Sequence, residues 1–134
     1  HPLPPPLGVP RRQGGQQVNN QPYTYTRDEL DLAKRIVAKV AQMYGCEESH
    51  LTDTSMRGFA FRQNLRRGRA MMAGAVAELM PVPLGTVLIG RILGVPRSSV
   101  TLWLKLHAGY TDDGYRARWE ELRAAMGANR ESAA

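Results

Sequence analysis

The stretch LIGRILGVPRSSVTLWLK, residues 88–105, limits the fold more than any other part of the chain. It contains two short segments with apolar residues at helical spacing, separated by a few residues that include Gly94 and Pro96. Gly94 suits a tight turn, and Pro96 suits the first turn of a helix, where its missing N–H is no loss. We therefore predict a helix over residues 84–93, a sharp corner, and a second helix over residues 96–107.

Helical periodicity continues before this corner, and no segment shows the sustained alternation that is typical of a β-strand. Residues 27–44 follow a capping box that Thr26 and Glu29 can form, and Gly45 is suited to end that helix. Residues 45–65 are expected to form a loop and a short helix.

Two further helices complete the predicted fold. The Ala- and Met-rich segment 66–80 predicts a long helix that ends before Pro81, because proline cannot continue the N–H ladder. A last helix is expected to be capped by Thr111 and to end at Gly127. The sequence thus predicts an all-α, compact bundle of about five helices that contains a helix-turn-helix.

Chain length and composition predict one folded domain between two flexible ends. The 134 residues leave little room for a second core. Five of the first ten residues are proline, and large apolar side chains are scarce in residues 1–25, so we expect a disordered tail there. The folded domain is expected over residues 26–127, with a flexible C-terminus at residues 128–134.

Cysteine content and hydropathy indicate the compartment. The lone Cys46 excludes a disulfide framework and a zinc site with several thiolates. No apolar run approaches the length of a membrane span. We therefore expect a soluble intracellular protein that does not bind membranes.

Positive charge is concentrated in the middle of the chain. Residues 54–110 contain eight Lys or Arg residues and one Glu, a net charge of +7, whereas the remaining ten basic and eleven acidic residues sum to −1. The basic residues of this block are Arg57, Arg62, Arg66, Arg67, Arg69, Arg91, Arg97 and Lys105. A local cationic block of this kind indicates a polyanionic partner.

The second helix of the corner has two different faces. Its apolar face is predicted to contain Val100, Trp103, Leu104 and His107. Its opposite face is predicted to contain Ser98, Thr101, Leu102 and Lys105, with Arg97 at the N-terminal end. Together with the cationic block, this pattern predicts binding of double-stranded DNA, with this helix in the major groove. Arg97 matches guanine, the hydroxyls suit bases or phosphates, and Leu102 suits a thymine methyl group.

The order of several short motifs resembles the C-terminal DNA-binding domain of the bacterial replication initiator DnaA, a relative of the Trp-repressor helix-turn-helix group. The matching segments are IVAKVAQMYG, then Leu51 and Arg57, then RGRAMMAGAVAEL, IG and SSV. The resemblance implies that Arg67 enters the minor groove from a basic loop before the long helix. We expect Arg66 and Arg69 beside it to contact the minor groove or the phosphates. It also places Arg97, Ser98 and Ser99 at positions of base and phosphate readers.

By position and charge, the resemblance further implies that Lys105 and Arg62 contact the DNA backbone. The family's Arg-Asp-His signature is replaced here by VPR, and its aspartate has no counterpart, so we do not expect the same target site. The chain also has no phosphate-binding GxxxxGK[ST] loop. A small transcription or replication regulator with a borrowed DNA-binding fold is the predicted function, and the resemblance implies that it acts in the bacterial cytosol or nucleoid.

Other functional patterns are weaker. Cys46 and His50 lack further ligands at usable spacing, and Asp112 with Asp113 suits the start of a helix better than a paired-carboxylate site. We therefore expect no catalytic residues, no metal and no cofactor.

Two alternatives remain open: a protein-interaction module of the replication or transcription machinery, and a small enzyme such as a nuclease. The N-terminal tail is also a candidate for binding a protein partner or a second copy of the chain.

Overall fold

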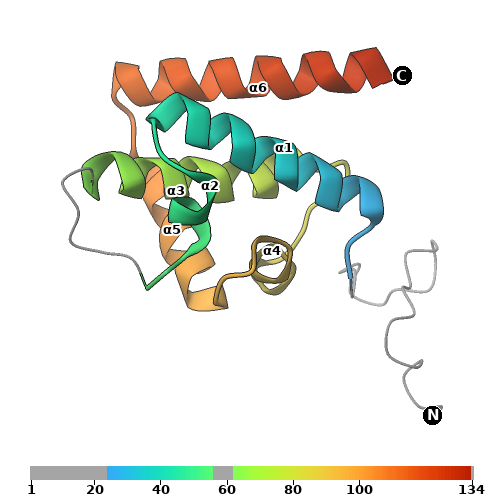
Figure 1. Cartoon of the computed structure of the whole chain (residues 1–134), viewed down its shortest axis with the longest axis horizontal. Coiled ribbons are helices and arrows are strands. Elements are labelled where there is room, and N and C mark those ends of the chain that lie inside the picture. The colour runs from blue at the N-terminus through green and yellow to red at the C-terminus, as the bar shows by residue number, and fades with distance from the viewer. Residues whose placement is uncertain (1–23, 56–61, 134) are drawn as a thin grey trace, which may run out of the picture.

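The computed structural model describes residues 24–55 and 62–133, and within them the fold is all-α, as predicted (Figure 1). The helices are α1 (Arg27–Tyr44), α2 (Glu48–Thr52), α3 (Arg62–Glu78), α4 (Thr86–Leu93), α5 (Arg97–Gly109) and α6 (Asp113–Ala133). Almost all of the predicted tail, residues 1–23, lies outside the described part.

Helix α1 has the predicted bounds. Thr26 and Glu29 form the capping box: the Glu29 N–H donates to Thr26 Oγ1 over 3.1 Å, and the Thr26 N–H donates to Glu29 Oε1 over 2.8 Å. Gly45 ends the helix with a φ of 67°, a conformation that glycine adopts without a steric penalty. Local hydrogen bonds therefore define both ends of α1.

Several predicted helix bounds are wrong. Helix α3 ends at Glu78 rather than residue 80, and α4 begins at Thr86 rather than residue 84. Helix α3 begins at Arg62 rather than residue 66. The turn that contains Leu65 is helical because the Leu65 side chain is buried in the core. Helix α6 is capped by Asp112 rather than Thr111, since the Tyr115 N–H donates to Asp112 Oδ2 over 3.1 Å.

The predicted end of α6 at Gly127 is also wrong. Helix α6 continues to Ala133, and among the described glycines only Gly45 and Gly94 have a positive φ. Gly127 therefore does not adopt the left-handed conformation that ends a helix.

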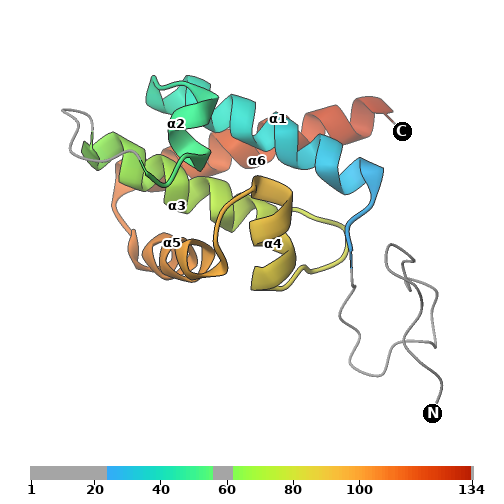
Figure 2. The same ribbon diagram turned by 60° about the horizontal axis from the view of Figure 1, so that its bottom comes forward.

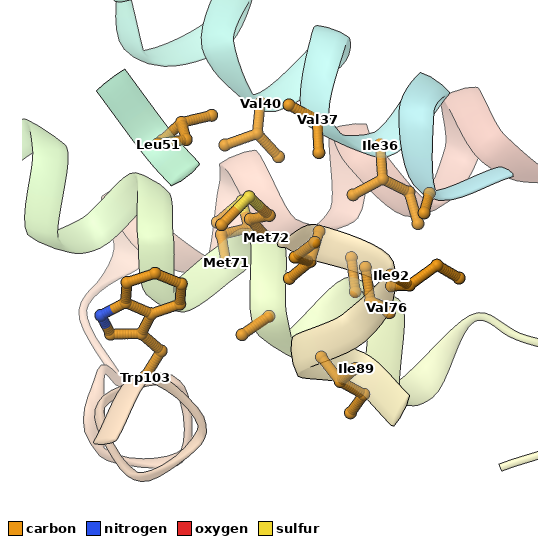
Figure 3. Close-up of a cluster of buried hydrophobic side chains, with 14 of the residues drawn as sticks. Ile36, Val37, Val40, Leu51, Met71, Met72, Val76, Ile89, Ile92 and Trp103 are labelled. Atoms are coloured by element: carbon orange, nitrogen blue, oxygen red, sulfur yellow. The ribbon is translucent and has the colours of Figure 1, made fainter. Parts of the chain in front are cut away.

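Helix α3 is the centre of the bundle and packs against every other described helix. Its buried residues Met71, Met72 and Val76 meet apolar side chains from α1, α2 and α4 (Figure 3). Helix α5 crosses α3 at Gly74, where an added Cβ would lie 2.5 Å from the His107 ring. This close approach of the two helices requires glycine at that position.

Helices α4 and α5 form the predicted corner. They diverge by 106°, and only the three residues 94–96 connect them. Gly94 has a φ of 72°, and Gly90 lies so close to the connection that an added Cβ would be 2.8 Å from the Val95 carbonyl oxygen. Figure 2 shows the two helices next to each other on one side of the bundle.

Among residues 24–55 and 62–133, no single helix is both long and apolar enough to cross a membrane. Helices α4 and α5 reach that length and apolar content only when taken together, and they are bent by 106° relative to each other.

Candidate nucleic-acid interface

The outer side of α5 is exposed and mostly polar. We call it the polar stripe, and it consists of Ser98, Thr101, Leu102 and Lys105. Leu102 is 53% exposed. On the opposite side, Val100 and Trp103 are buried in the core. The predicted division of this helix into two faces is therefore confirmed.

The edges of α5 are less sharply divided than predicted. Leu104 and His107, expected on the apolar face, are half-buried. Ser99, which the resemblance placed among the DNA readers, is also half-buried and lies beside the polar stripe. Only the centre of each face keeps the expected exposure.

Arg97 is the first residue of α5, and its side chain is exposed. Its Nε donates a hydrogen bond to Oγ1 of Thr86, the first residue of α4, over 3.1 Å. Its carbonyl oxygen accepts a hydrogen bond from the Thr101 hydroxyl over 3.2 Å. Arg97 therefore joins the start of both helices of the corner.

Arg69 is engaged in contacts within the protein. Its Nη2 donates to the carbonyl oxygens of His50 and Asp53 over 2.9 and 2.7 Å, and its Nε donates to that of Leu51 over 3.2 Å. Its Cζ also lies 5.5 Å from the centre of the Trp103 ring. Arg69 thus connects the C-terminal end of α2 to α3 and α5.

Arg67 is also engaged within the protein. Its Nη1 lies 2.8 Å from Asp112 Oδ1, and its Cζ lies 4.4 Å from the centre of the Tyr110 ring. The hydrogen bond from Arg67 holds the pKa of Asp112 below its ordinary value, and the Tyr115 N–H contributes in the same direction. The expected position of Arg67 in a loop before the long helix is wrong, because α3 already begins at Arg62.

Of the other arginines expected to contact DNA, Arg66 has a described side chain, whereas Arg57 and Arg62 do not. Arg66 is exposed on α3 and lies one turn before Arg69, on the same side of the helix. Because Arg69 contacts Trp103, this side of α3 adjoins the middle of α5. Arg57 and the side chain of Arg62 lie outside the described residues.

The sequence interpretation missed Thr86. Its only visible signal was a hydroxyl residue near the start of the predicted helix before the corner. The contact with Arg97 bridges eleven positions along the chain and depends on the angle between α4 and α5. Sequence spacing alone does not reveal such an angle.

A second polar group links α5 to its neighbours at the opposite end. His107 Nε2 lies 3.0 Å from Glu78 Oε2, and His107 Nδ1 lies 2.7 Å from the Tyr115 hydroxyl. This group borders a cavity of about 400 Å³ that Tyr110 and Trp119 also line. Both ring nitrogens of His107 are engaged, so the group joins α3, α5 and α6.

Residues 24–55 and 62–133 contain no cluster of three or more His, Cys, Asp or Glu side chains that could hold a metal ion. Burial raises the pKa of the half-buried Cys46 thiol, which makes it a weaker nucleophile at neutral pH.

Comparison with models of protein families gave no match, and neither the curated proteins nor the solved structures contain a significant match to the chain.

Proposed function

We propose that this protein binds double-stranded DNA in a sequence-dependent manner and regulates transcription or replication. In this proposal α4 and α5 form a helix-turn-helix, and α5 enters the major groove. The observation that carries the proposal is the exposed polar stripe of α5, which begins at the α4–α5 corner. An angle of 106° and a three-residue connection agree with the geometry of such units.

Charge supports the same partner. The net charge of +7 over residues 54–110 favours a polyanion, and phosphate contacts supply most of the sequence-independent affinity for DNA. Arg66 and Lys105 are exposed and are the best candidates for these contacts among the described residues. Arg67 and Arg69 have fewer free donors, because both guanidinium groups are engaged within the protein.

The outer side of α5 has the chemistry needed to distinguish bases. The Nη groups of Arg97 match guanine O6 and N7, and the Leu102 side chain suits a thymine methyl group. The Ser98 and Thr101 hydroxyls can contact bases or phosphates. For Arg97 and Ser98 these assignments agree with the resemblance to DnaA, although the missing signature aspartate predicts a different target site.

Selection of bound duplexes from a random library tests the proposal. We expect enrichment of a defined site that contains guanine, and weaker binding to all sequences at higher salt. The Arg35→Ala variant is a suitable charge control, since Arg35 is exposed on α1 and lies outside the cationic block of residues 54–110. Recovery of unrelated sequences only would contradict sequence-dependent binding.

A protein partner is a second candidate function, because three large apolar side chains are exposed on or near α4 and α5. Val82, Val87 and Leu102 are 38%, 45% and 53% exposed. Capture of one defined partner after nuclease treatment, without a gel shift on duplex DNA at low salt, would favour this function over DNA binding.

A further inference from the structure

We infer that Thr86 is a positioning residue that sets which nitrogen atoms of Arg97 face the DNA. The inference rests on the proposed function and identifies a determinant of specificity outside α5. It starts from the 3.1 Å hydrogen bond between Arg97 Nε and Thr86 Oγ1.

The Thr86 hydroxyl is suited to this role because capping does not use it. Thr86 is the first residue of α4, the N-cap is Gly85, and no side chain caps the helix. Thr86 itself is half-buried, and its hydroxyl already lies within hydrogen-bond distance of Arg97. It therefore offers a well-placed acceptor to the guanidinium group.

The contact selects one edge of the Arg97 guanidinium. Arginine can bind two acceptors through Nη1 and Nη2, or through Nε and one Nη. With Nε engaged by Thr86, only the end-on pair of Nη groups remains for the O6 and N7 atoms of guanine. Holding the side chain in this state before binding also reduces the entropy lost on binding.

The location of Thr86 connects this contact to the DNA backbone. In a helix-turn-helix the first helix crosses the backbone and the second enters the major groove. Thr86 begins the first of these helices, and Arg97 begins the second. When Thr86 Oγ1 accepts from Arg97, the Thr86 O–H is free to donate to a phosphate. The Thr86–Arg97 contact would then link the position of the protein along the DNA backbone to the recognition of one base.

The first test measures the contact in the free protein. We expect the Arg97 Nε–H to exchange slowly with water in the wild type and in Thr86→Ser, which keeps the hydroxyl. In Thr86→Val, which has a similar shape without the acceptor, exchange should be faster in ¹⁵N NMR spectra. Equal exchange in all three proteins would overturn the inference without reference to DNA. Thermal unfolding of each variant shows whether the fold is retained.

The second test measures the ratio of affinities for the selected site and for a duplex with its guanine replaced. Thr86→Val should reduce this ratio roughly two- to tenfold, the effect of one hydrogen bond, whereas Thr86→Ser should retain it. In an Arg97→Ala background, Thr86→Val should have no further effect on the ratio. A merely structural role would lower stability and leave the ratio unchanged.

The outcomes separate the two proposals. An unchanged ratio in Thr86→Val, or an equal reduction with and without Arg97, would overturn the role of Thr86 while DNA binding stands. A wild-type protein with no preference among duplexes would instead contradict the proposed function, and with it a role of Thr86 in reading DNA.

Discussion

The Tyr115 hydroxyl lies 2.7 Å from Nδ1 of His107, and the hydrogen bond between them connects α6 to α5. The direction of this bond follows from the neighbours of His107. Its Nε2 faces the Glu78 carboxylate, which only accepts, so in the neutral ring Nε2 carries the hydrogen and Nδ1 accepts. Burial raises the pKa of Tyr115, so the phenol keeps the hydrogen that it donates.

Removal of this hydroxyl should destabilise the bundle. In Tyr115→Phe, the His107 Nδ1 loses its hydrogen-bond partner in a largely buried place, so we expect the free energy of unfolding to fall by about 1–3 kcal/mol. Urea denaturation measures the change. Tyr110→Phe is the matched control and should have little effect, since it keeps the ring that Arg67 contacts. Equal stability of the two variants would show that the hydrogen bond to His107 contributes nothing.

Arg69 should contribute to stability more than to DNA affinity. Arg69→Ala removes hydrogen bonds to three carbonyl oxygens at the end of α2 and the contact with Trp103. We expect a loss of about 2–3 kcal/mol in the free energy of unfolding, because hydrogen bonds from charged groups are the stronger ones. Arg66→Ala is the control and should change stability by less than about 0.5 kcal/mol. A stable Arg69→Ala protein with weakened DNA binding would show that Arg69 acts at the interface instead.

Gly90 should tolerate no side chain. In Gly90→Ala the new Cβ would lie 2.8 Å from the Val95 carbonyl oxygen, so the α4–α5 corner must open. We expect a loss of about 1–3 kcal/mol, measured by thermal or chemical unfolding. Gly127→Ala is the control, because no other heavy atom lies within 4 Å of its added Cβ. That variant should be stabilised by up to about 1 kcal/mol, and similar losses in both would contradict the close approach at Gly90.

The Arg67–Asp112 pair should be visible in the titration of Asp112. The pKa of Asp112 is lowered in the folded protein, so its contribution to stability is present above the pKa of the unfolded chain. That contribution is lost as the pH falls through the folded pKa. Arg67→Gln should raise the pKa of Asp112 toward the ordinary value of about 3.9, as measured by ¹³C NMR of the carboxyl group. Asp113→Asn should leave this titration nearly unchanged, and an unchanged titration in Arg67→Gln would contradict the pairing.

Loss of Arg97 and loss of Arg66 should affect DNA binding differently. Arg97→Ala should cost about 1–3 kcal/mol on the selected site and much less on random duplex, because base contacts carry the sequence information. Arg66→Ala should weaken binding to both and reduce the slope of affinity against salt by about one. Titrations at several salt concentrations separate the two effects. Identical behaviour of the variants on every sequence would rule out direct readout by Arg97.

Features that depend on neighbouring residues were predictable from the sequence. The bounds of α1 follow from Thr26, Glu29 and Gly45, which lie within one turn of the helix ends. The two faces of α5 follow from helical periodicity, and the corner follows from Gly94 and Pro96. Each of these signals acts over a few residues, where backbone geometry is nearly independent of the rest of the chain.

Contacts between distant residues were decided only by the tertiary structure. Which arginines remain exposed depends on Asp112 meeting Arg67 across 45 positions, and on the α2 carbonyl oxygens meeting Arg69 across 16 to 19 positions. The Thr86–Arg97 contact likewise requires the angle between α4 and α5. The sequence by itself determined the helices and the amphipathic character of α5. The packing of α3 against its neighbours decided which charged side chains are left to meet a partner, because a guanidinium group engaged within the fold has fewer donors to offer.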